Sequence, residues 1–600
     1  MAVTAQTLTE LLFGALDRYQ SRPVAMRAKQ GGGWIELSYQ DLADRIHDLS
    51  VGLLDLGVSP GDRVAILSEN RPEWAIADYA CLAACCTDVP IYPTLLARQV
   101  EHNLSDSGST AVFVSTDAQL QKVLAARERL PRLRYIIAFD RSVTGHGVLN
   151  LEDVYARGRS ARASRANWKA DALRIRPDDL ATLIYTSGTT GEMKGVMLTH
   201  GNIASNVSTC CTLFSFTEHD ECLSFLPLSH IFERMFGHYC MLHSGVVINY
   251  AESVDTVAAD MQRWRPTLMA SVPRLYEKIY GRVLDAVRAG SPIKRRLFFW
   301  GKRVGEAAVD LRLSNRPLPA SLKAQFSVAD RLVFAKLRAR TGGRIRFFIS
   351  GGAPLSPDIA RFFHAAGMPV LEGYGLTETS PVIAVNTFEH QKLGTVGRPI
   401  PGVEVKIAPD GEIITRGPHV MVGYYNKADA TAESLDRDGW FHTGDIGMLD
   451  SDGFLRITDR KKDIIVTAGG KNISPQPIER LARMNRFVSN AVMLGDRRPF
   501  PIMLIVPNFD ALGAWATREG LPHTDGASLV AQPRVQAMME QEIRATLADL
   551  AGFERPKKLL LLPRDFNIEA DELTPKLSVK RKVVEQRHAA AIEALYHHPE

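Results

Sequence analysis

The sequence contains no run of about 18 uncharged apolar residues, the length that a membrane-spanning helix requires. Its first ten residues lack the basic and then apolar order of a secretory signal peptide. The seven cysteines are an odd number and include no Cys-x-x-Cys pair, which argues against a disulfide framework and against a zinc site. We therefore expect a cytoplasmic protein whose thiols are reduced.

Two common phosphate-binding motifs are also missing, although one stretch has the composition of a phosphate loop. Residues 185–195 hold three glycines, four Ser or Thr side chains and Lys194, directly after the apolar run Leu183–Tyr185. Glycines let backbone N–H groups approach a polyanion, and the hydroxyls and lysine add donors. Lys194 is followed by Gly195, so this is not a Walker A loop, and no Gly-x-Gly-x-x-Gly occurs in it. The stretch predicts another kind of phosphate loop, with a Gly/Ser/Thr-rich hairpin linker as the alternative.

The length of 600 residues, with 45% hydrophobic and 23% charged residues, allows two or more globular domains. Apolar strands alternate with amphipathic helices as far as about residue 394, which predicts an α/β fold of mainly parallel sheets covered by helices. Short β segments follow and predict a small β-barrel-like subdomain. The expected parts are an N-terminal domain at residues 1–459, including a β-rich subdomain at about 395–459 and a basic helical insertion at 282–346, then a hinge at 460–463 and a mobile C-terminal α+β lid domain at 464–600.

Local patterns predict individual elements. Residues 38–56 repeat apolar positions at helical spacing, and Gly57 fits a helix C-cap. Residues 89–93 predict a buried strand. Asp-Gly pairs end at Gly411, Gly439 and Gly453 and mark turns. The glycine-containing loops at 185–195 and 350–354 each follow a strand, the position in which α/β sheets bind ligands.

Four polar clusters interrupt the apolar pattern: Glu372–Thr379, Trp440–Asp445, Arg460–Asp463 and Lys576–Lys582. Together with the loop at 185–195, these long and widely spaced motifs resemble the acyl-adenylate-forming superfamily of acyl-CoA synthetases, adenylation domains and luciferases. Within it, the chain is most similar to bacterial long-chain fatty acyl-CoA synthetases. The resemblance runs from about residue 185 to the C-terminus, and the strands before it are compatible with the same fold.

The resemblance implies a site for ATP and Mg²⁺. It places the β- and γ-phosphates at Thr186, Ser187, Gly188, Thr189, Thr190, Gly191 and Lys194. It places the adenine beside Gly351, Gly352, Ala353, Tyr374 and Gly375, the α-phosphate at Thr377, and Mg²⁺ at Thr186 and Glu378.

The resemblance also implies sites for the other substrates and for a domain rotation. Asp445 and Arg460 are expected to contact the ribose, and Lys462 lies at the expected hinge. His230 is expected near the carboxylate of the fatty acid. Gly469, Gly470 and Lys471 are expected along the pantetheine arm of coenzyme A.

The chain departs from the family pattern at two places. The family's adenylation lysine aligns best with Ser578, which cannot carry a charge. Lys580 is the first substitute and Lys576 the second, because a long flexible side chain can reach from either position. The second departure is Arg234, which stands where some relatives have a tryptophan that gates the acyl tunnel. A solvated basic helix end is the alternative for the lysines.

The charge is unevenly distributed. Residues 282–346 contain sixteen Lys and Arg against four Asp and Glu, although the net charge of the whole chain is only +5. Ile293–Trp300 places cations between bulky apolar residues at helical spacing, which is typical of a helix lying on an anionic bilayer. A helical insertion with a solvated face is the alternative. Contact of this segment with the inner face of the membrane is the hypothesis to test against that alternative.

The resulting prediction is a ligase that uses ATP, Mg²⁺ and coenzyme A to convert long-chain fatty acids to acyl-CoA through acyl-AMP. One alternative is a fatty acyl-AMP ligase that donates to a carrier protein. The other is a non-catalytic scaffold that binds acyl groups or nucleotides, which Ser578 alone favours. Fatty acid, ATP and coenzyme A are the expected partners, no nucleic acid is expected, and assembly into a homo-oligomer is compatible with the sequence.

Overall fold

The computed structural model describes residues 5–187, 193–574 and 579–597, and the chain divides into two compact units. The first unit comprises Met1–Lys406, Ile414–Thr443 and Leu449–Arg456. The second comprises Ile407–Ile413, Gly444–Met448 and Ile457–Glu600. Among the described residues, no helix combines the length and the apolar character needed to cross a bilayer.

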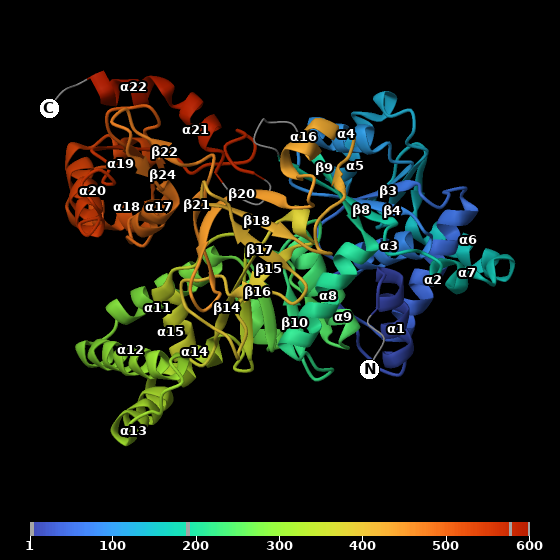
Figure 1. The fold of residues 1–600 in the computed structure, drawn as a ribbon, viewed down its shortest axis with the longest axis horizontal. Coiled ribbons are helices and arrows are strands. Elements are labelled where there is room, and N and C mark those ends of the chain that lie inside the picture. Colours follow the sequence, from blue (N-terminus) through green and yellow to red (C-terminus); the bar gives the residue numbers. More distant parts are fainter. Residues whose placement is uncertain (1–4, 188–192, 575–578, 598–600) are drawn as a thin grey trace. The chain divides into compact units, whose positions relative to one another are not determined.

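One large sheet of the first unit is eight-stranded (Figure 1). Its neighbours from β8 to β7 are parallel, and β9 and β19 add antiparallel strands at one edge. In spatial order its strands are β19 (Gly423–Tyr424), β9 (Met193–Thr199), β8 (Leu180–Ser187), β4 (Thr87–Ile91), β3 (Arg63–Leu67), β5 (Ala111–Val114), β6 (Tyr135–Ala138) and β7 (Val148–Asn150).

The other large sheet is nine-stranded, with parallel neighbours from β14 to β1 and antiparallel strands at both ends. In spatial order its strands are β16 (Arg398–Pro399), β15 (Val382–Val385), β14 (Val370–Gly375), β13 (Phe347–Ser350), β12 (Leu268–Ser271), β10 (Glu221–Ser224), β11 (Val247–Tyr250), β1 (Met26–Gln30) and β2 (Gly33–Leu37).

Helices connect the parallel strands of these sheets, as parallel neighbours require. The α-helices of the first unit are α1 (Leu8–Tyr19), α2 (Tyr39–Asp55), α3 (Pro72–Ala83), α4 (Ala97–Ser107), α5 (Asp117–Leu124), α6 (Leu151–Ala161), α7 (Trp168–Ala172), α8 (His200–Phe214), α9 (Met241–His243), α10 (Val257–Trp264), α11 (Pro273–Arg288), α12 (Pro292–Leu313), α13 (Ala320–Ala329), α14 (Ala335–Arg340), α15 (Pro357–Ala365) and α16 (Ala428–Ser434). Short 3₁₀ turns are η1 (Arg127–Arg129), η2 (Arg162–Arg165) and η5 (Thr377–Thr379), and π-helical segments are η3 (Glu233–Cys240) and η4 (Asp330–Phe334).

Helix α2 shows how the sequence sets an element. The Ser38 hydroxyl accepts from the Asp41 N–H, and the Asp41 carboxylate accepts from the Ser38 N–H, which completes a capping box. The helix stops before Gly57, whose φ of +89° is the left-handed conformation that glycine adopts without a Cβ clash. The predicted helix and its C-cap are confirmed.

A smaller sheet has the strand order β17 (Glu404–Ile407), β18 (Glu412–Arg416), β20 (Phe441–Leu449) and β21 (Leu455–Arg460). The glycines of the three predicted Asp-Gly turns, Gly411, Gly439 and Gly453, have φ values of +86°, +80° and +79°. These backbone conformations confirm the turns, because few residues other than glycine adopt them without strain.

The rest of the second unit is α+β. Strand β24 (Val488–Leu494) is antiparallel to β25 (Ile502–Pro507), which is parallel to β26 (Lys558–Leu561), and β22 (Ile465–Val466) pairs with β23 (Asn472–Ile473). Its helices are α17 (Pro475–Arg483), α18 (Phe509–Arg518), α19 (Gly526–Val530), α20 (Pro533–Thr546), α21 (Arg581–Arg587) and α22 (Ala589–His597). The α/β prediction is therefore confirmed: a large N-terminal part of mainly parallel sheets, a β-rich part and a smaller C-terminal part.

One buried acid stands out in the core of the first unit. Glu233, the first residue of η3, is 1% exposed. Its Oε1 accepts from Ser224 Oγ at 2.6 Å, and Oε2 has no hydrogen-bond partner in the described part of the chain. Burial raises the pKa of Glu233 to about 8, so the carboxyl keeps its proton at neutral pH.

This pKa predicts a pH dependence of stability. Between about pH 4.5 and 8 the folded chain holds a proton on Glu233 that the unfolded chain has lost, so the free energy of unfolding falls as the pH rises. The stabilisation from the protonated Glu233 is fully present below the pKa of the residue in the unfolded chain. Above that pKa it falls by up to about 1.4 kcal/mol per pH unit. Glu233→Gln removes this slope, which urea unfolding between pH 5 and 8 measures. Glu389→Gln, at an exposed position, is the control. An unchanged slope in Glu233→Gln contradicts the prediction.

Candidate active site

The predicted phosphate loop connects β8 to β9. Thr186 of β8 is opposite Lys194 of β9 in the antiparallel register. A Cβ on Gly195 would lie only 3.2 Å from Cζ of the Tyr185 ring, so this position requires glycine or a shift of the ring. Ser187 ends β8. The loop residues that were assigned to phosphate binding, Gly188, Thr189, Thr190 and Gly191, lie outside the described residues.

Tyr424 of β19 lies between two predicted site residues. Its hydroxyl donates to Glu378 Oε1 at 3.0 Å, and Lys194 Nζ lies 5.0 Å from the centre of its ring. Burial, and then the charge of Glu378, raise the pKa of Tyr424, so the phenol stays protonated and donates. The expected metal carboxylate and the expected phosphate lysine therefore share one contact, although 184 positions separate them in the chain.

The sequence analysis missed Tyr424. It stands in Gly423-Tyr424-Tyr425, a pattern that has no local signature of a site. Its position becomes informative only because β19 pairs with β9, with Tyr424 opposite Val196. Covariation between Tyr424 and Glu378 in an alignment is the signal that could have found it.

The residues assigned to adenine lie near the carboxyl ends of β13 and β14 in the nine-stranded sheet. Strands β13 and β14 are parallel neighbours, with Ser350 opposite Glu372, so Gly351 directly follows β13 and Tyr374 is the penultimate residue of β14. Gly352 has a φ of +79°, and Ala353 beside it is exposed.

Beyond Tyr374 the backbone turns sharply. A Cβ on Gly375 would lie 1.7 Å from the carbonyl oxygen of Pro381, which excludes every other residue without a backbone shift. Thr377 begins the short turn η5 and is buried, while Glu378 follows it and is partly exposed. Main-chain packing therefore holds the segment that carries the expected α-phosphate and metal contacts.

His230 lies between β10 and η3 and is partly exposed. Its Nδ1 accepts from the Phe232 N–H at 3.0 Å, so the histidine orients its own turn. A Cβ on Gly351 would lie 3.2 Å from Cε1 of Phe232, which places the Phe232 ring directly against the adenine segment. The residue assigned to the fatty acid carboxylate thus belongs to a turn that touches the residues assigned to adenine.

In the second unit, Asp445 of β20 is buried and Arg460 ends β21. Arg460 Nε lies 3.4 Å from Asp445 Oδ1, so the two residues assigned to the ribose form an ion pair. Next to them, Lys461 Nζ contacts Asp410 at 2.6 Å and Glu412 at 3.1 Å, and the hydrogen bond to Asp410 raises the pKa of Lys461. Lys462, the residue assigned to the hinge, is exposed.

The residues assigned to pantetheine form a tight turn between β22 and β23. The Lys471 N–H donates to Thr467 Oγ1 at 3.1 Å, and the Gly470 N–H donates to the Thr467 carbonyl at 2.8 Å. Gly469 and Gly470 are exposed, and Lys471 Nζ lies 5.8 Å from the centre of the Phe553 ring. The turn thus presents two exposed glycines and one cation at the surface of the second unit.

Lys580 is the residue before α21, and its Nζ contacts Asp571 Oδ1 at 2.6 Å. An ammonium held by a carboxylate must leave this ion pair before it can reach a substrate. Lys576 and Ser578 lie outside the described residues. Arg581, the next residue, donates instead to Glu479 at 2.6 Å and serves the packing of the second unit. Lys582 is exposed.

Known proteins match the chain over nearly its whole length. The AMP-binding enzyme family model matches residues 14–425, and the model of the AMP-binding enzyme C-terminal domain matches residues 462–600. A long-chain-fatty-acid–CoA ligase, FadD15 of Mycobacterium bovis, is 39% identical over 573 residues, which cover 94% of this chain and 93% of the relative. The peroxisomal long chain acyl-CoA synthetase 7 of Arabidopsis thaliana is 35% identical over 98% of this chain and 86% of its own.

Solved structures share the fold. The anthranilate CoA ligase AuaEII in complex with anthranoyl-AMP superimposes with a TM-score of 0.73 at 17% identity and covers 99% of this chain and 98% of its own. A Mycobacterium tuberculosis fatty acyl CoA synthetase superimposes with a TM-score of 0.60 at 21% identity over 98% and 99% of the two chains. The predicted resemblance is confirmed, and the chain belongs to the AMP-binding enzyme family, as a long-chain acyl-CoA synthetase-like member of the acyl-adenylate-forming superfamily.

Proposed function

We propose that the protein is a ligase that joins long-chain fatty acids to coenzyme A at the expense of ATP. The observation that carries the proposal is the match to a bacterial relative named as a long-chain-fatty-acid–CoA ligase and a plant relative named as a long chain acyl-CoA synthetase, each covering at least 94% of this chain. The arrangement of Thr186, Lys194, Glu378 and Tyr424 in the first unit supports it, because it gathers phosphate and metal contacts at strand ends.

The first step activates the carboxylate, which is a poor electrophile. A carboxylate oxygen of the fatty acid attacks the α-phosphorus of ATP, and the bond from that phosphorus to the bridging oxygen breaks, so pyrophosphate leaves with the electron pair. Negative charge builds on the phosphoryl oxygens, so positioning and positive charge lower the barrier. We assign Lys194 and the 186–191 loop to the β- and γ-phosphates, Thr377 to the α-phosphate, and Lys580 or Lys576 to the developing charge.

The oxygen ligands in the first unit fit Mg²⁺. Glu378 offers a carboxylate that a tyrosine hydroxyl orients, and Thr186 offers a hydroxyl at the end of β8. Among the described residues no group of three or more His, Cys, Asp or Glu could hold a metal ion. Mg²⁺ commonly uses one or two carboxylates and the substrate phosphates. When bound, it supplies charge neutralisation on the phosphates, and Glu378 and Thr186 would hold it.

The second step forms the thioester. The sulfur of coenzyme A attacks the acyl carbon of acyl-AMP, the bond from that carbon to the phosphate oxygen breaks, and AMP leaves while the thiol proton passes to solvent. We assign the turn at Gly469, Gly470 and Lys471 to the pantetheine arm. The two steps need different surroundings, which a hinge at residues 460–463 between domains at 1–459 and 464–600 would supply.

The remaining contacts follow the family pattern. We assign adenine to Gly351, Gly352, Ala353, Tyr374 and Gly375, the ribose to Asp445 and Arg460, and the fatty acid carboxylate to the turn of His230. The fatty acyl-AMP ligase and the non-catalytic scaffold are the competing functions. The naming of both cited relatives as CoA ligases or acyl-CoA synthetases favours coenzyme A over a carrier protein.

A paired assay tests this function and the lysine assignment. With ATP, Mg²⁺ and palmitate, we expect pyrophosphate release and, with coenzyme A, loss of free thiol. In Lys580→Ala we expect pyrophosphate release to fall at least about 100-fold, since one positioned cation acts on the transition-state charge. Lys582→Ala removes an exposed lysine two positions away and is the control. If pyrophosphate release falls in Lys576→Ala and not in Lys580→Ala, the adenylation role belongs to Lys576. Pyrophosphate release without loss of thiol identifies an acyl-AMP ligase. If the wild-type protein releases no pyrophosphate, both ligase functions are refuted.

Tyr424 gives a second prediction. Tyr424→Phe keeps the ring beside Lys194 and removes the hydroxyl that orients Glu378. Loss of such a supporting hydrogen bond costs 10- to 100-fold in metal affinity or activity. We expect the Mg²⁺ concentration for half-maximal pyrophosphate release to rise about 10-fold. Tyr425→Phe, at the neighbouring half-buried tyrosine, serves as the control. Equal Mg²⁺ dependence in the two variants would show that Glu378 does not need Tyr424.

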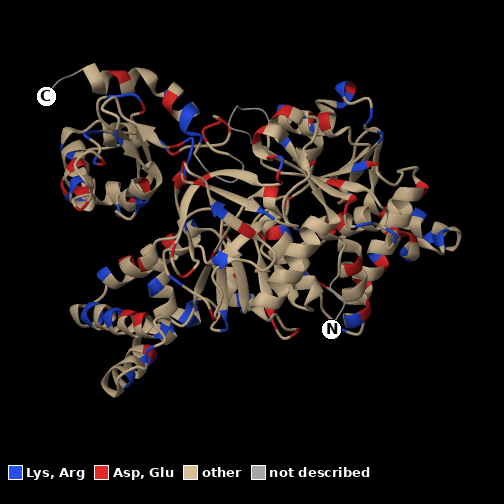
Figure 2. Cartoon of the chain, viewed as in Figure 1, with Lys and Arg blue, Asp and Glu red and all other residues tan. Residues whose placement is uncertain are grey.

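The surface of helices α12 and α13 suggests that the protein also binds a lipid surface. In Figure 1 the pair lies at the lower left, beyond α15, and its charged residues are mostly Lys and Arg (Figure 2). Phe299 of α12 is 40% exposed and stands within one turn of Arg295, Arg296 and Arg303, which are exposed and lack ion pairs in the described structure. Ile293 at the start of the helix is 80% exposed.

Exposed apolar side chains among unpaired cations match an interface of acyl chains and anionic headgroups. We propose that α12 docks on anionic bilayers, from which a long-chain fatty acid would be taken. Each cation near such a surface contributes about 1 kcal/mol. The homo-oligomer remains a prediction of the sequence alone.

Flotation with vesicles tests the docking surface. We expect binding to phosphatidylcholine vesicles that contain phosphatidylglycerol and little binding to phosphatidylcholine alone. Replacing Lys294, Arg295 and Arg296 with Gln should weaken binding about 100-fold, given about 1 kcal/mol per cation. A matched variant with Gln at Arg141, Arg437 and Arg518, all exposed, loses the same charge elsewhere. If the two variants partition equally, α12 has no specific role and only the net charge matters.

A further inference from the structure

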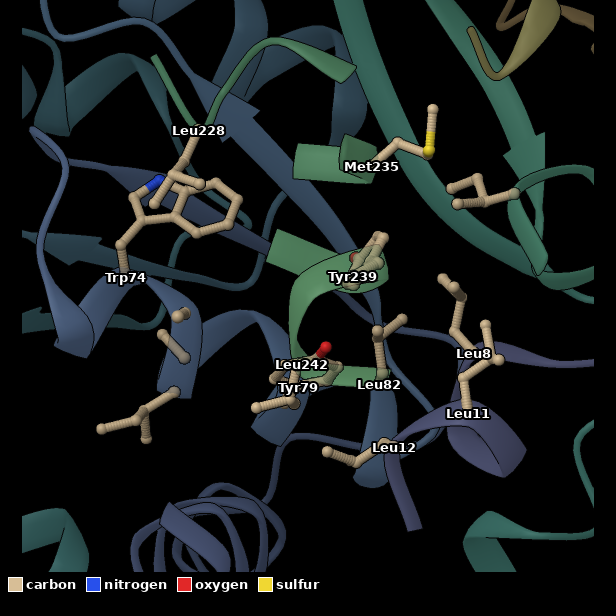
Figure 3. Close-up of a cluster of buried hydrophobic side chains, with 14 of the residues drawn as sticks. Leu8, Leu11, Leu12, Trp74, Tyr79, Leu82, Leu228, Met235, Tyr239 and Leu242 are labelled. Carbon is tan, nitrogen blue, oxygen red and sulfur yellow. The ribbon is translucent and has the colours of Figure 1, made fainter. Parts of the chain in front are cut away.

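Arg234 is the largest charged side chain that is completely buried in the first unit. It is the second residue of the π-helical segment η3. A guanidinium does not lose its charge in a protein, so its burial is tolerated only when anions and hydrogen-bond acceptors surround it. Trp74 and Tyr79 of α3 and Tyr239 of η3 belong to the cluster of buried side chains shown in Figure 3, and the ring centres of Trp74 and Tyr239 lie 5.7 and 5.4 Å from Arg234 Cζ.

Two carboxylates and two hydroxyls satisfy the guanidinium. Nη2 donates to both Asp78 and Asp88, Nε donates to the Tyr239 hydroxyl at 2.8 Å, and Nη1 donates to Thr182 Oγ1 at 3.0 Å. The hydroxyls are held in turn, because Tyr239 donates to Asp78 at 2.8 Å and Thr182 donates to Asp88 at 2.7 Å. Both carboxylate side chains have no exposed area.

These partners belong to different elements. Asp78 lies on α3, Asp88 on β4 and Thr182 on β8, whereas Arg234 and Tyr239 lie on η3. Strands β4 and β8 are neighbours in the eight-stranded sheet, and η3 follows β10 of the nine-stranded sheet. The network therefore links the eight-stranded sheet to the helical segment between β10 and β11 of the nine-stranded sheet through charged hydrogen bonds, which are stronger than neutral ones.

The two ends of this network lead to the segments assigned to the two substrates of the first step, the fatty acid and ATP. On one side, the guanidinium anchors the start of η3, whose main-chain N–H at Arg234 donates to the His230 carbonyl at 3.1 Å, and the Phe232 ring packs on Gly351. On the other side, Thr182 lies four residues before Thr186 on the same strand. Arg234 thus joins the turn assigned to the fatty acid carboxylate to the strand that carries the phosphate loop.

We propose that Arg234 is a positioning residue that sets the distance between the fatty acid carboxylate and the ATP triphosphate held by the loop after β8. This inference rests on the proposed function. Arg234 is wholly enclosed and touches neither reactant, so it acts through His230 and β8. Protein interiors are close-packed, so a change in the side chain at position 234 shifts the turn of His230 and is not taken up by empty space around it. A misplacement of about 1 Å between reacting groups costs about 100-fold in rate.

The test separates positioning from stability. Arg234→Met leaves two buried carboxylates without a cation and is expected to destabilise the fold. A second variant combines Arg234→Met with Asp78→Asn and Asp88→Asn, which removes every charge of the network and should restore folding. The control combines Arg338→Met with Asp330→Asn, an ion pair of η4 and α14 with contacts of 2.7 and 2.9 Å. Pyrophosphate release with ATP and palmitate, without coenzyme A, isolates the first step.

We expect the uncharged triple variant to have a urea midpoint near that of wild type and a KM for ATP within about 3-fold, while its kcat per folded molecule falls about 100-fold. The control variant should keep its kcat. Arg234→Lys should fall between wild type and the triple variant, because lysine restores the charge but not the planar fork. A triple variant with the wild-type kcat overturns the proposal and leaves Arg234 a purely structural role. Silence of wild type with every fatty acid overturns the proposed function as well.

Discussion

Burial of one continuous apolar core between the two large sheets is the constraint on which the rest of the first unit depends. The core includes Ile66 and Ile184 from the eight-stranded sheet and Ile248, Leu268 and Phe347 from the nine-stranded sheet. Apolar burial of this kind is strong but carries little direction. It brings the sheets together without fixing how the end of one strand faces the end of another.

The direction comes from a few polar groups that the core encloses. Glu233 stays protonated and holds Ser224, while Arg234 distributes its donors over four partners. At the edge of the core, Tyr424 connects Lys194 and Glu378. Side chains assigned to substrates are thus oriented by supporting residues packed behind them, which is how a site built on loops and turns keeps a fixed geometry.

The sequence predicted what local chemistry determines and missed what the tertiary fold determines. Alternating strands and helices, the cap at Gly57 and the turns at Gly411, Gly439 and Gly453 each depend on neighbouring residues, and all were found. The strand predicted at residues 89–93 lies instead at Thr87–Ile91, because pairing with β3 and β8 sets its ends. Tyr424 contacts Glu378, 46 positions away, and Arg234 contacts Asp88 and Asp78, 146 and 156 positions away. No local sequence pattern encodes contacts at such separations. Family motifs identified the fold, yet the roles of the site residues remain predictions.

The buried network of Arg234, Asp78 and Asp88 also restricts how the protein can evolve. Loss of the arginine alone leaves two buried acids without their cation, and loss of either acid leaves a cation short of acceptors, each at a cost of about 3 to 5 kcal/mol. A typical domain has only about 5 to 15 kcal/mol of stability, so single changes would rarely survive. The three positions should therefore covary in evolution. They should be retained together in some lineages and replaced together by apolar residues in others.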